Sequence, residues 1–182
     1  MRDYRVKIKS PGELAVIVAN LKAKGGTVVQ CHGAFDLLHR GHLHQFEQAR
    51  REGDSLVVSV TSDRFVNKGP NRPVFPLQVR MEMIAALECV DFATFSDAAS
   101  SEEVIRILKP SVYIKGQAYE DASRDRSGKI TLEHRAVESV GGRIHFTNEL
   151  PIHSTPLLNS FVDPYPESVL RFLEDFKRKF PV

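Results

Sequence analysis

Residues 31–42 read Cys-His-Gly-Ala-Phe-Asp-Leu-Leu-His-Arg-Gly-His, and they join an apolar strand to a helix. The apolar run that begins at Val28 leads into this stretch, and Gly33 permits a sharp bend directly after it. The pattern then becomes helical over about residues 41–51. We therefore expect a turn at the carboxyl end of a strand, which is where ligands bind in an open parallel sheet.

Two histidines three residues apart, His39 and His42, follow this bend and surround Gly41. A helix amino terminus offers free backbone N–H groups and a partial positive charge, both of which favour phosphate. With the imidazole rings beside such an anion site, the stretch is typical of a turn that binds a nucleoside triphosphate. A second interpretation is that the histidines only cap the helix.

A third interpretation is a metal site, because His44 lies close to the same pair. A zinc site needs further cysteine, histidine or carboxylate ligands, yet Cys31 and Cys89 are far apart and form no Cys-x-x-Cys pair. We interpret His32 and His44 as structural or solvent-facing residues.

Strands and helices alternate along the rest of the chain. A capping serine at Ser10, a proline and then Glu13 predict a helix that ends near Ala23. Apolar runs of the kind Leu-Val-Val-Ser-Val indicate strands covered on both faces, joined by right-handed crossovers. We predict the α/β class, with a doubly wound, five-stranded parallel sheet whose strands lie at Val28–Cys31, Leu56–Thr61, Phe92–Phe95, Val112–Lys115 and Arg143–Phe146.

Length and composition limit the class of protein. The chain has 182 residues, which suits one α/β domain with appended helices. Its 25 basic and 23 acidic residues give a formal charge of +2, so composition shows no strong attraction to nucleic acid or to a membrane. Two cysteines, no long apolar run and no signal-like amino terminus lead us to expect a cytoplasmic protein with neither nucleic acid nor membrane as partner.

Further cations are candidates for phosphate binding. Lys68 and Arg72 lie in a polar stretch after the second predicted strand, and Arg80 lies in the first turns of the next helix. Lys115 ends the fourth predicted strand beside Gly116. The alternative interpretation of the first three is a solvated basic loop with an ordinary surface ion pair.

A hydroxyl cluster, Ser154 and Thr155, precedes Pro156 and two leucines, which is typical of a first helical turn. Hydroxyl groups and free N–H groups there could hold the β- and γ-phosphates. Simple capping of that helix is the alternative.

The quoted stretch resembles the Gly-x-Phe-Asp-x-x-His-x-Gly-His motif of the cytidylyltransferase-like nucleotidyltransferases, with Gly33, Phe35, Asp36, His39, Gly41 and His42 at the motif positions. The Ser154 segment resembles their Ile-Ser-Thr-Thr motif, with Pro156 in place of a hydroxyl residue. Similarity to the heptose 1-phosphate adenylyltransferase branch covers roughly residues 27–159 and includes Asn71-Arg72-Pro73-Val74, Pro76-Leu77, Arg80-Met81, Ala86-Leu87-Glu88, Val90-Asp91 and Lys115-Gly116.

The resemblance implies a Rossmann-like nucleotidyltransferase that moves AMP or CMP from ATP or CTP to a sugar phosphate and releases pyrophosphate. Mg²⁺ would bind mainly through the nucleotide phosphates, with no metal ligands from the protein. The catalytic candidates are His39, His42, Lys68 and Arg80; the nucleotide-binding candidates are Gly33, Ala34, Phe35, Asp36, Gly41, Ser154 and Thr155; and the acceptor-binding candidates are Asp36, Lys115 and Gly116.

Other functions remain open at this point. One is a cytidylyltransferase for glycerol phosphate or a similar small alcohol phosphate, and another is a degenerate, regulatory nucleotide-binding domain. A dinucleotide-binding module would need a Gly-x-Gly-x-x-Gly turn, which the sequence lacks. A class I aminoacyl-tRNA synthetase fragment would need a Lys-Met-Ser-Lys-Ser-like loop, which is also missing.

The chain divides into a nucleotidyltransferase domain with an amino-terminal helix, residues 1–162, and a carboxyl-terminal segment, residues 163–182. Apolar residues at intervals of three or four predict an amphipathic helix in this segment. We expect it to pack against the domain, with a homodimer contact as the competing hypothesis. The segment also resembles a linker to a fused, ribokinase-like sugar kinase domain. The charged residues 119–135 are either an acceptor-binding lid or a surface loop.

Overall fold

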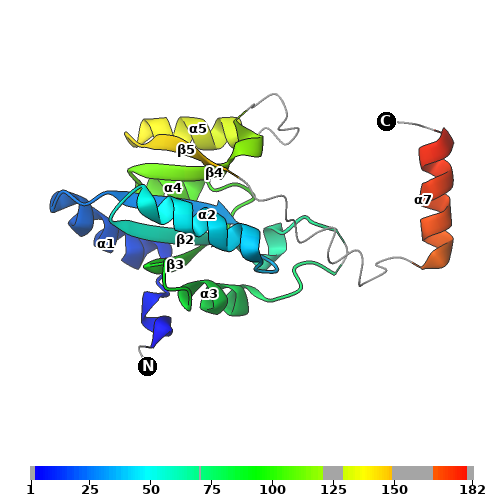
Figure 1. Ribbon diagram of the computed structural model, residues 1–182, viewed down its shortest axis with the longest axis horizontal. Helices are drawn as coiled ribbons and strands as arrows, with labels where there is room; N and C mark the ends of the chain where they lie inside the picture. The colour runs from blue at the N-terminus through cyan, green and yellow to red at the C-terminus, as the bar shows by residue number, and fades with distance from the viewer. Residues whose placement is uncertain (1–2, 70, 121–128, 149–165, 180–182) are drawn as a thin grey trace.

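The structure is a computed structural model that describes residues 3–69, 71–120, 129–148 and 166–179 (Figure 1). The described residues form one five-stranded sheet in which every pair of neighbouring strands is parallel, in the order β3-β2-β1-β4-β5. The strands are β1 (Val28–Gly33), β2 (Ser55–Thr61), β3 (Phe92–Ser96), β4 (Val112–Gly116) and β5 (Arg143–Thr147). All five predicted strands are confirmed, each within two residues of its predicted ends.

Helices connect the strands and cover both faces of the sheet (Figure 1). The α-helices are α1 (Pro11–Ala23), α2 (Arg40–Arg51), α3 (Leu77–Ala85), α4 (Glu102–Leu108), α5 (Lys129–Ser139) and α7 (Glu167–Lys179), and the short 3-10 helices are η1 (Tyr4–Lys7), η2 (Asp63–Phe65) and η3 (Gln117–Tyr119). The predicted capping of α1 is confirmed. The Ser10 side chain accepts from the Glu13 backbone N–H, and the Glu13 carboxylate accepts from the Ser10 N–H.

The core lies in two layers because alternate residues of each strand point to opposite faces. One layer joins Val29, Cys31, Leu56 and Val58 to side chains of α2 and α3, including Phe46 and Ile84. The other layer joins Val28 and Val57 to α1 and α4, with α5 packed beside α4. Both layers are fully buried, so the strands carry apolar residues on both faces and read as continuous apolar runs.

The order of the strands places the candidate site. From β1 the chain moves outward to β2 and β3, and it then returns to the other side of β1 to form β4 and β5. The crevice at such a reversal, outside the carboxyl ends of β1 and β4, is the general ligand position in doubly wound sheets. The histidine turn follows β1 directly, and Lys115 and Gly116 end β4.

The predicted amphipathic helix near the carboxyl end is confirmed as α7. The expected packing against the domain is not observed among the described residues. Phe172, Leu173 and Phe176 remain exposed, and α7 lies apart from the sheet in Figure 1. A sequence pattern identifies an apolar stripe, but it does not identify the surface that covers the stripe. None of the described helices is both long enough and apolar enough to cross a bilayer.

Candidate active site

The histidine turn begins with His39, which is the residue that caps α2. Its backbone is extended, and its Nδ1 accepts a hydrogen bond of 3.1 Å from the Gly41 backbone N–H. A neutral imidazole has one protonated nitrogen, so an acceptor at Nδ1 puts the proton on Nε2. The capping interpretation is therefore correct for His39, and capping leaves this ring with a hydrogen-bond donor at Nε2.

His42 lies one turn further along α2 and stacks on His39. The two ring centroids are 3.8 Å apart, and the ring planes differ by 25°. The Nδ1 atom of His42 is buried and makes no hydrogen bond to the described residues. The two stacked rings thus lie at the first turn of a helix, where backbone N–H groups favour an anion.

Phe35 supports this histidine pair from the core side. Its ring meets the His42 ring edge to face at 5.2 Å and the Phe46 ring at 5.1 Å. A Cβ atom at Gly33 would lie 2.9 Å from Cζ of Phe35, so only glycine leaves room for the ring. The backbone of Phe35 has a φ of 45°, which is rare for a bulky residue and is typical of functional turns.

Asp36 is buried at the same turn, and both of its carboxylate oxygens have partners. Oδ1 accepts from the backbone N–H groups of Val74 at 2.6 Å and of Phe75 at 3.3 Å. Oδ2 lies 3.0 Å from Nη1 of Arg72, whose side chain is also buried. These contacts join the histidine turn to the segment that precedes α3.

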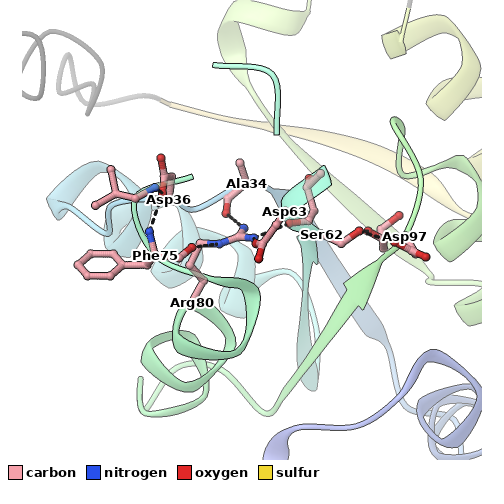
Figure 2. Close-up of polar contacts among 10 residues, drawn as sticks. Ala34, Asp36, Ser62, Asp63, Phe75, Arg80 and Asp97 are labelled. Carbon is pink, nitrogen blue, oxygen red and sulfur yellow. Dashed lines mark hydrogen bonds and ion pairs between the residues drawn. The ribbon is translucent and has the colours of Figure 1, made fainter. Parts of the chain in front are cut away.

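Arg80 is the largest fully buried side chain of the described residues, and its guanidinium group connects four segments (Figure 2). Nε donates to the Phe75 carbonyl at 2.9 Å, and Nη1 donates to the Ala34 carbonyl. Nη2 donates to the Thr61 carbonyl at 2.9 Å and pairs with Asp63 at 2.6 Å. The sequence indicated a cation at this position, and the structure shows one that is occupied by protein contacts.

Lys68 differs from Arg80 because the residue is exposed to solvent, although nearby protein atoms remove part of the water around its amino group. No hydrogen bond or ion pair joins it to another residue of the described ranges. Removal of water by the surrounding protein lowers the pKa of Lys68, and the positive charges of Arg72 and Arg80 lower it further. Asp36 acts in the opposite direction. Lys68 is therefore a cation in a positive environment, which favours the approach of an anion.

Lys115, at the end of β4, forms an ion pair with a buried carboxylate of the protein. Its Nζ lies 2.5 Å from the buried carboxylate of Glu133 on α5 and also approaches the Tyr113 and Tyr119 rings. The other Glu133 oxygen accepts from the Ser101 hydroxyl at 2.8 Å, and that hydroxyl is 2.6 Å from the Tyr113 hydroxyl. Burial first, and then the Glu133 charge, raise the pKa of Tyr113.

The structure brings the histidine pair, Lys68, Asp36 and Arg80 to the same edge of the sheet, and Lys115 and Gly116 end the neighbouring strand β4 at that edge. Ser154 and Thr155 lie outside the described residues. Sequence reasoning missed the role of Glu133, and it missed the pairing of Asp36 with Arg72. A local sequence pattern does not identify a partner that is distant in the chain. The only sequence signal for these pairs is a charged residue beside the end of a buried strand.

Comparisons with known proteins identify the family of this chain. Residues 31–161 match the family model described as cytidylyltransferase-like. A bifunctional protein HldE of Desulfatibacillum aliphaticivorans is 38% identical over 143 residues, which are 78% of this chain and 28% of that protein. A bifunctional protein HldE of Streptomyces coelicolor is 44% identical over 122 residues, which are 66% of this chain and 26% of that protein. The matched region thus spans about a quarter of each relative.

Solved structures resemble the fold. A lipopolysaccharide core biosynthesis protein of Thermoplasma volcanium aligns with a TM-score of 0.55 at 23% identity, covering 71% of this chain and all of the other. A pantoate-beta-alanine ligase of Francisella tularensis aligns with a TM-score of 0.56 at 16% identity, covering 81% and 68%. At these identities the likeness supports the α/β fold and nothing beyond it.

Proposed function

The chain belongs to the cytidylyltransferase-like family and is a nucleotidyltransferase, and we propose that it transfers AMP from ATP to a sugar phosphate. The observation that carries the proposal is the stacked pair His39 and His42 at the start of α2, outside the carboxyl end of the central strand. The similarity to proteins named bifunctional protein HldE, and the resemblance to heptose 1-phosphate adenylyltransferases in the Asn71 to Asp91 segment, support a sugar phosphate as acceptor.

The reaction is a substitution at the α-phosphorus of the nucleotide. An oxygen of the acceptor phosphate forms a bond to that phosphorus, the bond to the β-phosphate bridging oxygen breaks, and pyrophosphate leaves with the electron pair. The acceptor phosphate is already ionised near neutral pH, so no side chain has to remove a proton from it. Catalysis then depends on positioning and on neutralising the charge that develops.

The histidine pair is proposed to neutralise the negative charge that develops during the substitution. With its proton on Nε2, His39 donates a hydrogen bond toward the phosphates, and His42 donates from the adjacent position. Lys68 adds a positive charge from the neighbouring loop. Ser154 and Thr155 remain predicted ligands of the pyrophosphate end. Contact of Arg80 with that end also stays a prediction, although the guanidinium group is fully buried.

Magnesium fits this site as an ion carried by the nucleotide. The described part of the chain has no group of three or more His, Cys, Asp or Glu residues that could hold a metal. The nearby carboxylates of Asp36 and Asp63 are already paired with arginines. Binding of a magnesium ion mainly through the nucleotide phosphates, where it would neutralise negative charge, stays a prediction.

Pyrophosphate release tests the proposal. Purified protein with Mg²⁺ is supplied with ATP or CTP and with heptose, pentose and glycerol phosphates. Release with ATP and a sugar phosphate supports the proposal, whereas release only with CTP and glycerol phosphate contradicts it. Thermal stabilisation by a nucleotide without turnover on any acceptor would favour a regulatory nucleotide-binding domain.

A pair of variants ties the activity to the site. His42→Ala should lower turnover by ~10²-fold or more, because it removes one donor to the developing charge. His44→Ala, on the same helix, is the matched control and should leave turnover near the wild-type value. Wild-type turnover in a folded His42→Ala protein would refute the role assigned to the histidine pair.

A further inference from the structure

The carboxylate of Asp36 is turned into the protein rather than toward the crevice. The left-handed backbone at Phe35 reverses the chain, and the Asp36 side chain that follows has no exposed surface. Its two oxygens meet two backbone N–H groups and one guanidinium group, all from residues 72–75. Among the described residues Oδ2 makes only the ion pair with Arg72, so it is the complete burial of the carboxylate that separates it from a substrate hydroxyl.

The segment that Asp36 holds is the one that carries the exposed cation. Residues 66–76 connect η2 to α3 and contain Lys68 and Arg72, while the chain on the other side of the contact leads directly to His39. Asn71 adopts a left-handed backbone in the middle of this segment. Residues 66–69 and 71–76 lie outside the hydrogen-bonded helices and strands, so these tertiary contacts help to decide where the segment lies.

We propose that Asp36 is a positioning residue that docks the 66–76 segment onto the histidine turn and so fixes Lys68 beside the phosphates that the histidines bind. The proposal rests on the proposed nucleotidyl transfer for its role in catalysis. It assigns Asp36 to the internal structure of the site, in place of the contacts with nucleotide and acceptor that the motif resemblance implies.

Electrostatics gives Asp36 a second effect on the same lysine. Three charged groups act on Lys68: Arg72 and Arg80 lower its pKa, and Asp36 raises it. Without the Asp36 charge, both arginines would act unopposed, and the pKa of Lys68 would fall further. Asp36 therefore helps to keep Lys68 protonated as well as in place.

Hydrogen exchange and lysine reactivity test the docking without any need for turnover. In Asp36→Ala, the amides of Val74 and Phe75 lose their acceptor, and we expect their exchange to quicken at least ~10-fold while β1 and β2 stay protected. In Asp36→Asn, which retains an acceptor oxygen but no charge, acylation of Lys68 should reach its plateau at a lower pH than in the wild type. Unchanged exchange and an unchanged lysine profile would overturn the proposal.

Kinetics supplies a readout that a merely structural role would not move. In Asp36→Asn, the loss of activity on the alkaline side should begin at a lower pH, because Lys68 gives up its proton earlier. Arg72→Gln combined with Asp36→Asn should lower kcat/KM no further than Asp36→Asn alone, since both changes break one contact. Independent, multiplicative losses, or an unmoved alkaline limb, would contradict the proposal.

Glu52→Gln is the matched control. Glu52 pairs with Arg143 at 2.8 Å at the opposite edge of the sheet, so its substitution removes an ion pair remote from the site. We expect its pH profile and its 66–76 exchange to match the wild type, and a shift in either would contradict the site-specific role of Asp36. A wild-type protein that releases no pyrophosphate with any acceptor would contradict the proposed function. The hydrogen-exchange results would still test whether Asp36 docks the 66–76 segment.

Discussion

The two sides of the crevice hold their cations in different ways. On the β1–β2 side, Arg80 is enclosed by backbone carbonyls of three segments, and Lys68 of the preceding segment is exposed. On the β4–β5 side, Lys115 pairs with the buried carboxylate of Glu133. From the sequence alone, all three cations are candidates for phosphate binding. The difference teaches that a cation near a strand end can organise the site as well as bind to the substrate.

Arg80→Met gives the largest expected effect. The change leaves the carbonyls of Ala34, Thr61 and Phe75 without their buried donor, and we expect a loss of about 3–5 kcal/mol in the free energy of unfolding. For a chain of this length the melting temperature should fall by about 6–20 °C. Denaturant unfolding measures the change. An unaltered free energy of unfolding would show that the buried contacts of Arg80 do not stabilise the site, and the contrast between Arg80 and Lys115 would then be smaller.

Lys115→Met should destabilise less, by about 2–3 kcal/mol, because it removes one partner of a single, partly accessible ion pair. Its diagnostic is rescue by the partner. Lys115→Met combined with Glu133→Gln should recover most of the loss, since no unpaired buried charge remains. Additive losses in the double variant would mean that the pair is not what holds Lys115, and the contrast with Arg80 would need another cause.

Gly33→Ala should cost about 1–2 kcal/mol, because the new methyl group meets the Phe35 ring at a distance that real contacts do not allow. Turnover should fall as well, since the same ring supports His42. Gly12→Ala is the control, because a Cβ atom there has open space in α1. Normal turnover in Gly33→Ala would show that the support of the histidine pair does not depend on Phe35.

Lys68→Arg gives the smallest expected effect at neutral pH. An arginine retains the charge that lysine loses as pH rises through its lowered pKa. We therefore expect activity near pH 7 to stay close to that of the wild type, but with the alkaline loss displaced to higher pH. A pH series of pyrophosphate release measures this displacement. An identical alkaline limb in both proteins would assign the titration to another group.

Much of the fold followed from local patterns. Buried strands of Val, Ile and Leu, a capping serine with a glutamate three residues later, and glycine at a crowded turn are each decided by neighbours in the chain. The histidine turn belongs to this group, because its bend, cap and helix start are consecutive residues. The family match over residues 31–161 confirms the superfamily predicted from that turn.

The partners of the buried charges could not be predicted in the same way. Asp36 meets Arg72, and Lys115 meets Glu133, across separations that only chain folding closes. The family resemblance implied that Asp36 and Lys115 contact the substrate. A charged residue beside a strand end is equally compatible with contact to substrate and with an ion pair inside the protein. The apolar face of α7 is a similar case, since its pattern predicts a helix without naming its neighbour.

The sequence by itself determined the alternation of strands and helices, the parallel sheet and the histidine turn, because hydrophobic period, capping and backbone freedom act between residues close in the chain. Tertiary structure decided which cations are enclosed and which stay exposed. That choice depends on desolvation and on charge pairing, which are set by groups that approach only when the strands have assembled.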